Sequence, residues 1–185
     1  MKNLKILATV ILATLSFASC SNDDDLPEVI HEEEIITTMT VTLVPDNDGT
    51  STVTLKTQDL DGDGPDEPTI EVIGKLVTGV TYNGTILLEN ETENPAENIT
   101  EEVEEESLDH QFFFTIGDGL DVTIAYSNFD SADNPLGTVF TLTAGDASSG
   151  LLTFTLRHEP TKPNTGLDDA GGETDIQESF EIVVE

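Results

Sequence analysis

The chain has few cations, few aromatic residues and almost no sulfur. Its 185 residues include 6 Lys plus Arg against 38 Asp plus Glu, which gives a formal net charge of -32. Binding to phosphates requires clustered cations, so this composition excludes a nucleic-acid-binding role. The same charge repels an anionic bilayer surface unless a covalent group anchors the chain there. The single cysteine excludes an internal disulfide, and the absence of tryptophan with only two tyrosines leaves little aromatic surface for stacking sugars or bases.

Motifs of the common enzyme classes are also missing. The sequence contains no Gly-rich phosphate loop, no nucleophile elbow and no paired-histidine zinc motif. Carboxylates are so abundant that a pair of them says nothing about acid/base catalysis without geometry. The sequence therefore predicts that the protein is not an enzyme, and it assigns no catalytic residue.

The first 19 residues are typical of an export signal. Lys2 and Lys5 make a basic start, and residues 6–17 form an uncharged, mostly apolar run that is too short to cross a bilayer as a ~20-residue helix. Residues 17–20, Phe-Ala-Ser-Cys, then resemble the lipobox of bacterial lipoproteins. That resemblance implies cleavage before Cys20 and acylation of its thiol and new amino terminus, and two or three acyl chains anchor a protein stably. The alternative is a free cysteine near an ordinary cleavage site.

Residues 20–34 are predicted to be a lipidated acidic tether, because they contain proline and many acids but no apolar period. The start of this tether resembles the acidic export tag that sends the lipoproteins of one Gram-negative group to the outer face of the outer membrane. The residues that carry the resemblance are Ser21, Asp23, Asp24 and Asp25. It implies display at the cell surface; the alternatives are a solvated spacer and a location on the periplasmic face.

Residues 35–185 are predicted to be all-β, as a single antiparallel β-sandwich of the immunoglobulin-like kind. Several segments alternate apolar residues with Thr or charged residues, the period-2 pattern of strands with one buried face. Turns rich in Gly, Asn and Asp separate these segments, and a chain of about 150 residues can bury one such core. The expected inward residues are Met39, Val41, Leu43, Val53, Leu55, Val122, Ile124, Tyr126, Phe140, Leu142, Leu152, Phe154, Leu156, Phe180, Ile182 and Val184.

One short acidic helix is predicted within residues 94–110, as a connection between two strands. Asn98 and Glu101 have the spacing of a capping box, and Ile99 and Val103 lie on one helical face. Glutamates favour the first turn of a helix but repel one another along its length. We therefore expect the acidic face of this helix to be solvated.

An acidic loop at residues 59–70 suggests calcium binding. Aspartates stand at relative positions 1, 3 and 5 with glycine at position 6, as in the first half of a calcium loop, but position 12 is isoleucine instead of glutamate. Alternate carboxylates of this kind can converge on a hard cation. The predicted ligands are Asp59, Asp61, Asp63 and Asp66. The alternative is an acidic turn between strands that binds no ion.

His110 and His158 are the two histidines of the predicted domain, and both are expected at strand ends beside carboxylates. If these ends converged, two imidazoles and a carboxylate could hold zinc or copper. No close sequence spacing joins them, and isolated histidines are more often hydrogen-bonded surface groups, so the sequence does not predict a shared site. A blue-copper centre is excluded because it needs a thiolate and the only cysteine is assigned to lipid.

Several runs of the mature chain look like a family of uncharacterised exported bacterial lipoproteins, whose members sometimes carry the label "type 1 periplasmic binding fold superfamily protein". The runs lie at residues 32–38, 59–64, 109–114, 156–160 and 171–175. The resemblance implies no established activity and transfers no functional residue. Residues 130–132, Asp-Ser-Ala, also resemble a short O-glycosylation site of exported proteins, with Ser131 as the modified residue.

Together these features predict a non-catalytic, lipid-anchored binding module of the outer membrane or cell surface. Its carboxylate-rich loops suggest that it captures a ligand or cation as an accessory of an outer-membrane transporter. The alternative is a structural or adhesive surface domain in which calcium stiffens the loops. A transporter gene beside this one would favour the first role.

Overall fold

The computed structural model describes residues 34–62 and 64–185. The compact unit that contains them runs from Glu33 to Glu185, close to the domain boundary expected at residue 35. The expected signal, lipid anchor and export tag lie outside the described residues. In the described part of the chain, no helix has both the length and the apolar character needed to cross a membrane.

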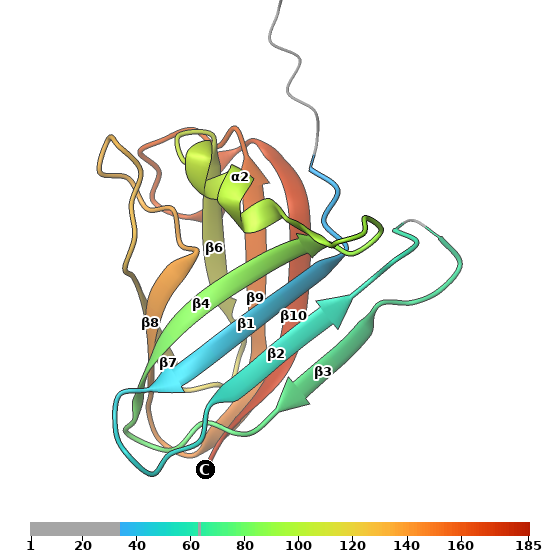
Figure 1. Cartoon of the computed structure of the whole chain (residues 1–185). Helices are drawn as coiled ribbons and strands as arrows, with labels where there is room; N and C mark the ends of the chain where they lie inside the picture. The colour runs from blue at the N-terminus through green and yellow to red at the C-terminus, as the bar shows by residue number, and fades with distance from the viewer. Residues whose placement is uncertain (1–33, 63) are drawn as a thin grey trace, which may run out of the picture. The chain divides into compact units, whose positions relative to one another are not determined.

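Two antiparallel sheets form the domain (Figure 1). The larger sheet has the order β3-β2-β1-β4-β8-β7, and the short strand β5 pairs with β4. Its strands are β1 (Thr38–Pro45), β2 (Val53–Gln58), β3 (Thr69–Ile73), β4 (Thr81–Asn90), β5 (Glu97–Asn98), β7 (Val122–Tyr126) and β8 (Val139–Ala144). The smaller sheet has the order β10-β9-β6 and consists of β6 (His110–Ile116), β9 (Ser148–His158) and β10 (Glu173–Val184).

The core lies between the two sheets, and it consists largely of the residues that alternation predicted. The expected inward residues of β1, β2, β8, β9 and β10 are all buried, while Ile124 and Tyr126 of β7 are partly buried. The ring of Phe154 in β9 lies 6.0 Å from that of Phe140 in β8 and 5.9 Å from that of Phe180 in β10, measured between centroids. Burial of each such side chain stabilises the fold by about 1.5–3 kcal/mol. The all-β antiparallel sandwich is therefore confirmed.

The connecting helix is present as α2 (Ile99–Glu105) and covers one end of β4 (Figure 1). The side-chain oxygen of Asn98 accepts a hydrogen bond from the Thr100 N–H at 3.1 Å, and its amide donates to Glu101 at 3.0 Å. Ile99 and Val103 are buried. A second helix, α3 (Leu167–Ala170), was not predicted; it is a four-residue turn in the connection between β9 and β10.

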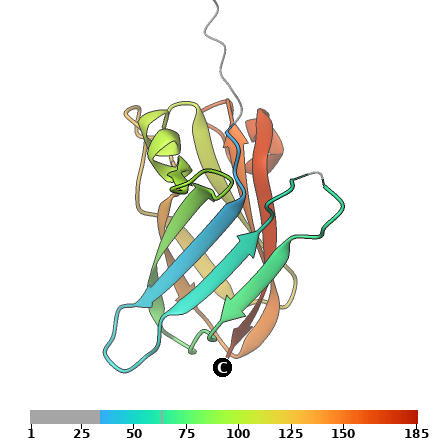
Figure 2. The ribbon, with the colours of Figure 1, turned by 45° about the vertical axis from the view of Figure 1, so that its right-hand side comes forward.

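The two lateral edges of the sandwich are closed to different extents. At one edge β10 lies beside β3 (Figure 2), and the segment after β3 forms a parallel bridge between Leu76 and Val184. Leu76 N–H donates to the Val183 carbonyl and the Glu185 N–H donates to the Leu76 carbonyl, both at 2.9 Å. The other edge is bordered by β6 and β7, which follow each other in the chain but lie in different sheets and do not pair.

Candidate metal centre

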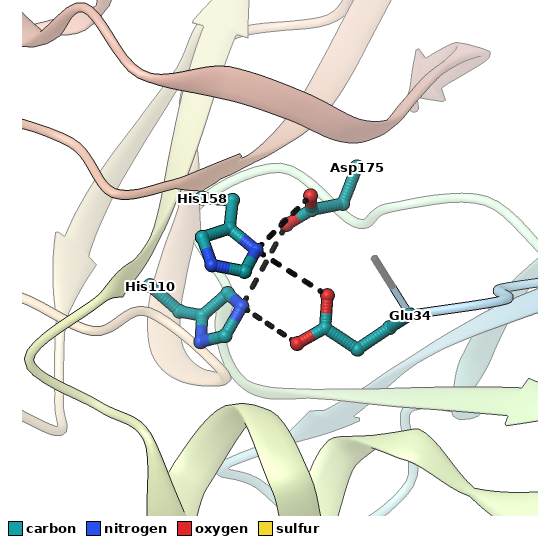
Figure 3. Close-up of side chains that lie close together, drawn as sticks. All are labelled: Glu34, His110, His158 and Asp175. Atoms are coloured by element: carbon teal, nitrogen blue, oxygen red, sulfur yellow. Dashed lines mark ion pairs between the residues drawn. The ribbon is translucent and has the colours of Figure 1, made fainter. Parts of the chain in front are cut away.

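Four side chains that are distant in sequence converge at one end of the smaller sheet (Figure 3). They are Glu34, His110, His158 and Asp175, and their potential ligand atoms all lie within 4.8 Å of one another. The exposed fractions of these side chains are 6%, 0%, 9% and 4%, in that order. This buried group of two imidazoles and two carboxylates could hold a metal ion.

The pairing of β6 with β9 brings the two histidines together. His110 is the first residue of β6, His158 is the last residue of β9, and the two are direct register partners. Because residues directly opposite in antiparallel strands project to the same face, the two imidazoles become neighbours. Their ring centroids lie 4.6 Å apart with an interplanar angle of 58°.

A β-bulge in β10 supplies Asp175. Thr174 pairs with Arg157 and Ile176 pairs with Leu156, so Asp175 is an extra residue opposite one step of β9. An extra residue shifts the inward and outward alternation of a strand by one position and re-aims the side chain at that point. The carboxylate of Asp175 therefore faces the histidines, while the inward residues further along β10 keep their places in the core.

Glu34 reaches the site from the segment that leads into the larger sheet. It precedes β1 by a few residues, and the segment between them is fixed to β4, because the Thr37 N–H donates to the Glu89 carbonyl at 3.0 Å. The sequence placed residue 34 at the end of the tether, but its buried side chain belongs to the folded domain. The cluster thus joins the segment leading into the larger sheet to the end of the smaller sheet.

Each carboxylate approaches both imidazoles through different oxygens. His110 Nε2 lies 3.0 Å from Glu34 Oε1 and 3.8 Å from Asp175 Oδ2. His158 Nδ1 lies 3.5 Å from Glu34 Oε2 and 3.7 Å from Asp175 Oδ1. Figure 3 shows the two nitrogens and the carboxylate oxygens pointing toward a common centre.

The second ring nitrogen of His110 fixes its tautomer. Nδ1 lies 3.2 Å from the Glu106 carbonyl oxygen, and since that oxygen only accepts, Nδ1 must donate. Burial lowers the pKa of His110 below 6.5, and the neighbouring Glu34 carboxylate opposes this shift without reversing it. In the neutral ring, Nε2 carries a lone pair and faces another acceptor on Glu34. A cation between Nε2 and the Glu34 oxygen would be coordinated by both of these acceptors. The hydrogen bond from Nδ1 to a backbone carbonyl is a common support for histidines that bind metals.

A buried lysine holds the start of β6 in place. Lys162 Nζ donates to the carbonyls of Ser107 and His110 at 2.7 and 2.6 Å and to Asp130 Oδ2 at 3.1 Å. The side chains of Lys162 and Asp130 are 6% and 0% exposed. Burial raises the pKa of Asp130, but two backbone N–H groups of its own turn and Lys162 lower this pKa by more, so the net shift is downward. The backbone of His110 is therefore anchored to the connection that follows β9.

The predicted calcium loop is an exposed connection between β2 and β3. The Asp61 N–H donates to Asp59 Oδ1 at 3.2 Å, and the Asp66 N–H donates to Asp61 Oδ2 at 3.4 Å, so two of the carboxylates bond to the loop's own backbone. Asp63 lies outside the described residues. Among the residues that are described, the loop does not form a cluster of three or more potential ligands. Calcium binding here stays a prediction.

The other predicted sites also stay predictions. Cys20 and the export tag at residues 21–25 precede the described residues. Ser131 is exposed, in the turn that buries Asp130.

Of the four cluster residues, the sequence indicates only the two histidines as possible ligands. The carboxylates beside them in the sequence are Asp109 and Glu159, whereas the carboxylates of the cluster belong to Glu34 and Asp175.

Comparisons of the chain with protein-family models, with curated proteins and with solved structures return no match.

Proposed function

We propose that the protein is an exported, lipid-anchored and non-catalytic binding module whose β-sandwich holds one divalent transition metal ion, with zinc as the first candidate. The observation that carries the proposal is the buried convergence of Glu34, His110, His158 and Asp175. Export and anchoring at Cys20 come from the sequence.

The donor atoms favour a transition metal over calcium or magnesium. Calcium and magnesium take oxygen ligands, whereas imidazole suits zinc, copper, iron and nickel. Two ionised carboxylates also balance the charge of a divalent ion, which matters in a site whose side chains are at most 9% exposed. This site is separate from the predicted calcium loop, whose side chains offer only oxygen.

The spacing of the donors can be compared with that of tetrahedral zinc. With zinc–ligand bonds of about 2.0–2.1 Å, neighbouring ligand atoms of a tetrahedron lie about 3.3 Å apart. The nitrogen–oxygen distances in the cluster are 3.0, 3.5, 3.7 and 3.8 Å, measured to both oxygens of each carboxylate. One donor atom from each of the four residues lies within 4.8 Å of the others, so the side chains have to draw closer together to coordinate one tetrahedral ion.

The burial of the site favours retention of the ion over catalysis. Catalytic zinc sites have three protein ligands and keep a position open for water or substrate, whereas structural sites are closed by four protein ligands. Here four side chains are available and all are buried or nearly so. An ion bound in this way stabilises the folded state, because the unfolded chain does not bring the four ligands together.

Metal titration of the protein tests the proposal. Protein stripped with a chelator should bind one zinc ion per chain in competition with a chromogenic chelator. Asp175→Asn and His158→Gln should each weaken binding by at least about tenfold, the effect that loss of even a second-shell partner can produce.

Asp168→Asn and His31→Gln are the matched controls. Asp168 is exposed outside the cluster, and His31 is the one histidine that precedes the described residues. Both variants should bind zinc like the wild type. Failure of the wild type to bind zinc, copper, nickel or iron at one ion per chain would reject the proposal, as would unchanged affinity in the two ligand variants.

A further inference from the structure

A cavity of about 510 Å³ lies beside β6, an edge strand of the smaller sheet. This volume is within the range of about 300–1,000 Å³ that is typical of ligand pockets. Its other walls come from β7 and from the connection between β9 and β10. The apolar residues that line it are Phe113, Phe114, Ile116, Ile124, Tyr126 and Leu167. None of them belongs to the candidate metal centre.

The cavity is closed at both ends. At one end the hydroxyl of Tyr126 in β7 donates to the Phe112 carbonyl in β6 at 2.9 Å, and the ring of Tyr126 packs against that of Phe114 with 5.3 Å between centroids. At the other end residues 117–121 connect β6 directly to β7. Between these ends residues 113–116 line the cavity, and they span about 10 Å along the strand. The space is therefore suited to a small molecule and not to an extended chain.

The backbone of β6 offers polar groups to a ligand in this cavity. Residues 113–116 alternate between the two faces of β6 and all line the cavity, so the cavity lies along the edge of the strand. The Gly117 N–H donates to β9, whereas the Phe112 N–H donates to a carbonyl outside the smaller sheet. By the same alternation, the backbone groups of Phe114 and Ile116 face away from β9. No strand of the described chain pairs with this side of β6.

The wall formed by the connection between β9 and β10 is held in place and leaves one carboxylate free. Asn164 Nδ2 donates to Gln111 Oε1 at 2.8 Å, which ties the connection to β6. The Asp169 carboxylate accepts from the Thr165 N–H at 3.0 Å and so closes its own turn. Asp168 is exposed, lines the cavity, and makes no hydrogen bond or ion pair with the described residues. Its negative charge is therefore available to a ligand.

These groups indicate a ligand that is positively charged at one end and apolar at the other. No Lys, Arg or His of the described chain lines the cavity, so an anion would meet only acids there. An ammonium group donates three hydrogen bonds, and the carboxylate of Asp168 and the free carbonyls of β6 are acceptors. The net charge of -32 also raises the concentration of small cations near the protein. The apolar side chains leave room for a hydrocarbon or aromatic group.

We propose that this cavity binds a small primary amine that carries an apolar group. The ammonium group faces Asp168 and the free edge of β6, and the apolar group packs beside Ile124 and Leu167. The cavity shares no residue with the candidate metal centre, so either proposal can fail without the other.

Four small molecules test the proposal by titration of the full protein, followed by NMR of its backbone amides. The probe is 2-phenylethylammonium, which should bind with a Kd of about 1 mM or tighter. Ethylammonium lacks the apolar group and 3-phenylpropionate reverses the charge, so each should bind at least about tenfold more weakly. The neutral 2-phenylethanol should bind about threefold more weakly, as expected for loss of an exposed ion pair. A probe Kd weaker than about 1 mM, or an analogue that binds as tightly as the probe, would overturn the proposal.

The position of the site is tested by the amide signals and by one pair of variants. The probe should shift the signals of Phe114, Ile116 and Ile124, and shifts confined to other strands would overturn the proposal. Ile116→Lys places an ammonium group of the protein itself at the cavity and should weaken probe binding at least about tenfold. Ile73→Lys is the matched control, because Ile73 is 54% exposed on β3 and Ile116 is 39% exposed on β6. Equal effects of the two lysines would show that the probe senses only the net charge, which also overturns the proposal.

A second pair of variants keeps the test independent of any disturbance by the new lysine. Asp168→Asn should weaken binding of 2-phenylethylammonium about threefold and leave binding of 2-phenylethanol unchanged. Asp48→Asn makes the same charge change at an exposed position between β1 and β2 and should affect neither ligand. An amine affinity that is unchanged by Asp168→Asn, or that falls equally in both variants, would contradict the role of Asp168 and overturn the proposal.

Discussion

Replacement of Glu34 by glutamine should change the stability of the metal-free and zinc-bound protein in opposite directions. In the metal-free protein Glu34 Oε1 lies 3.0 Å from His110 Nε2, and both atoms are acceptors when the ring is neutral. Burial lowers the pKa of His110 below 6.5 and so keeps the ring neutral at pH 7.5 to 8. A glutamine amide can donate an N–H to Nε2 at this distance. The same amide is uncharged and is a weaker ligand for zinc than the carboxylate.

The sizes of the two effects follow from the contacts. A buried polar atom without a partner costs about 1–3 kcal/mol, so the new hydrogen bond should stabilise the metal-free variant by about 1–2 kcal/mol. In a domain of this size that raises the melting temperature by roughly 2–8 °C. At free zinc equal to about 100 times the wild-type Kd, zinc should stabilise the wild type by about 2.7 kcal/mol. A variant that binds about tenfold more weakly gains only about 1.4 kcal/mol at the same zinc concentration.

Thermal melts followed by circular dichroism, in EDTA and in a zinc-buffered solution, measure both effects. Glu181→Gln is the control, because Glu181 is exposed on β10 away from the cluster residues, and it should melt like the wild type in both solutions. A Glu34→Gln protein that melts below the wild type in EDTA would refute the assignment of two facing acceptors. An unchanged zinc-induced shift would refute the role of Glu34 as a ligand.

Two further outcomes are expected. Cys20→Ser should abolish incorporation of radiolabelled lipid and leave the protein soluble or unprocessed, and a mutant that still fractionated with outer membranes would contradict anchoring at Cys20. Asp130→Asn should destabilise the protein at pH 7 by about 3 kcal/mol, because it leaves the buried Lys162 ammonium without its carboxylate. Since the folded state lowers the pKa of Asp130 below 3.8, the stability it contributes is present above that pH and is lost as the pH falls through the lowered pKa. Denaturant unfolding at several pH values should therefore show the two proteins converging in acid, and a constant gap would contradict this.

The sandwich could be predicted from the sequence because its core follows a period of two. Met39, Val41 and Leu43 are all fully buried in β1, as the alternation indicated. The helix could be predicted because Asn98 and Glu101 form local contacts that need no knowledge of the rest of the fold. The order of the strands in the sheets could not be predicted. Alternation shows which face of a strand is buried, but it does not show which strand lies beside it.

The candidate site depends on that missing information. His110 and His158 are partners only because β6 pairs with β9 in one particular register. Asp175 faces them because of a single extra residue in β10, and no residue type in that strand marks the position of the bulge. Glu34 is the last of three consecutive glutamates, and nothing in the sequence distinguishes it from the other two. A buried carboxylate among many exposed ones leaves no sequence signal.

The four cluster residues come from distant parts of the domain. One comes from the beginning of the domain, two come from a strand pair in its middle and one comes from its last strand, and together they connect both sheets. A chain in which any one of these segments is out of place lacks a ligand, so an ion bound at the cluster would stabilise the complete fold and neither sheet alone.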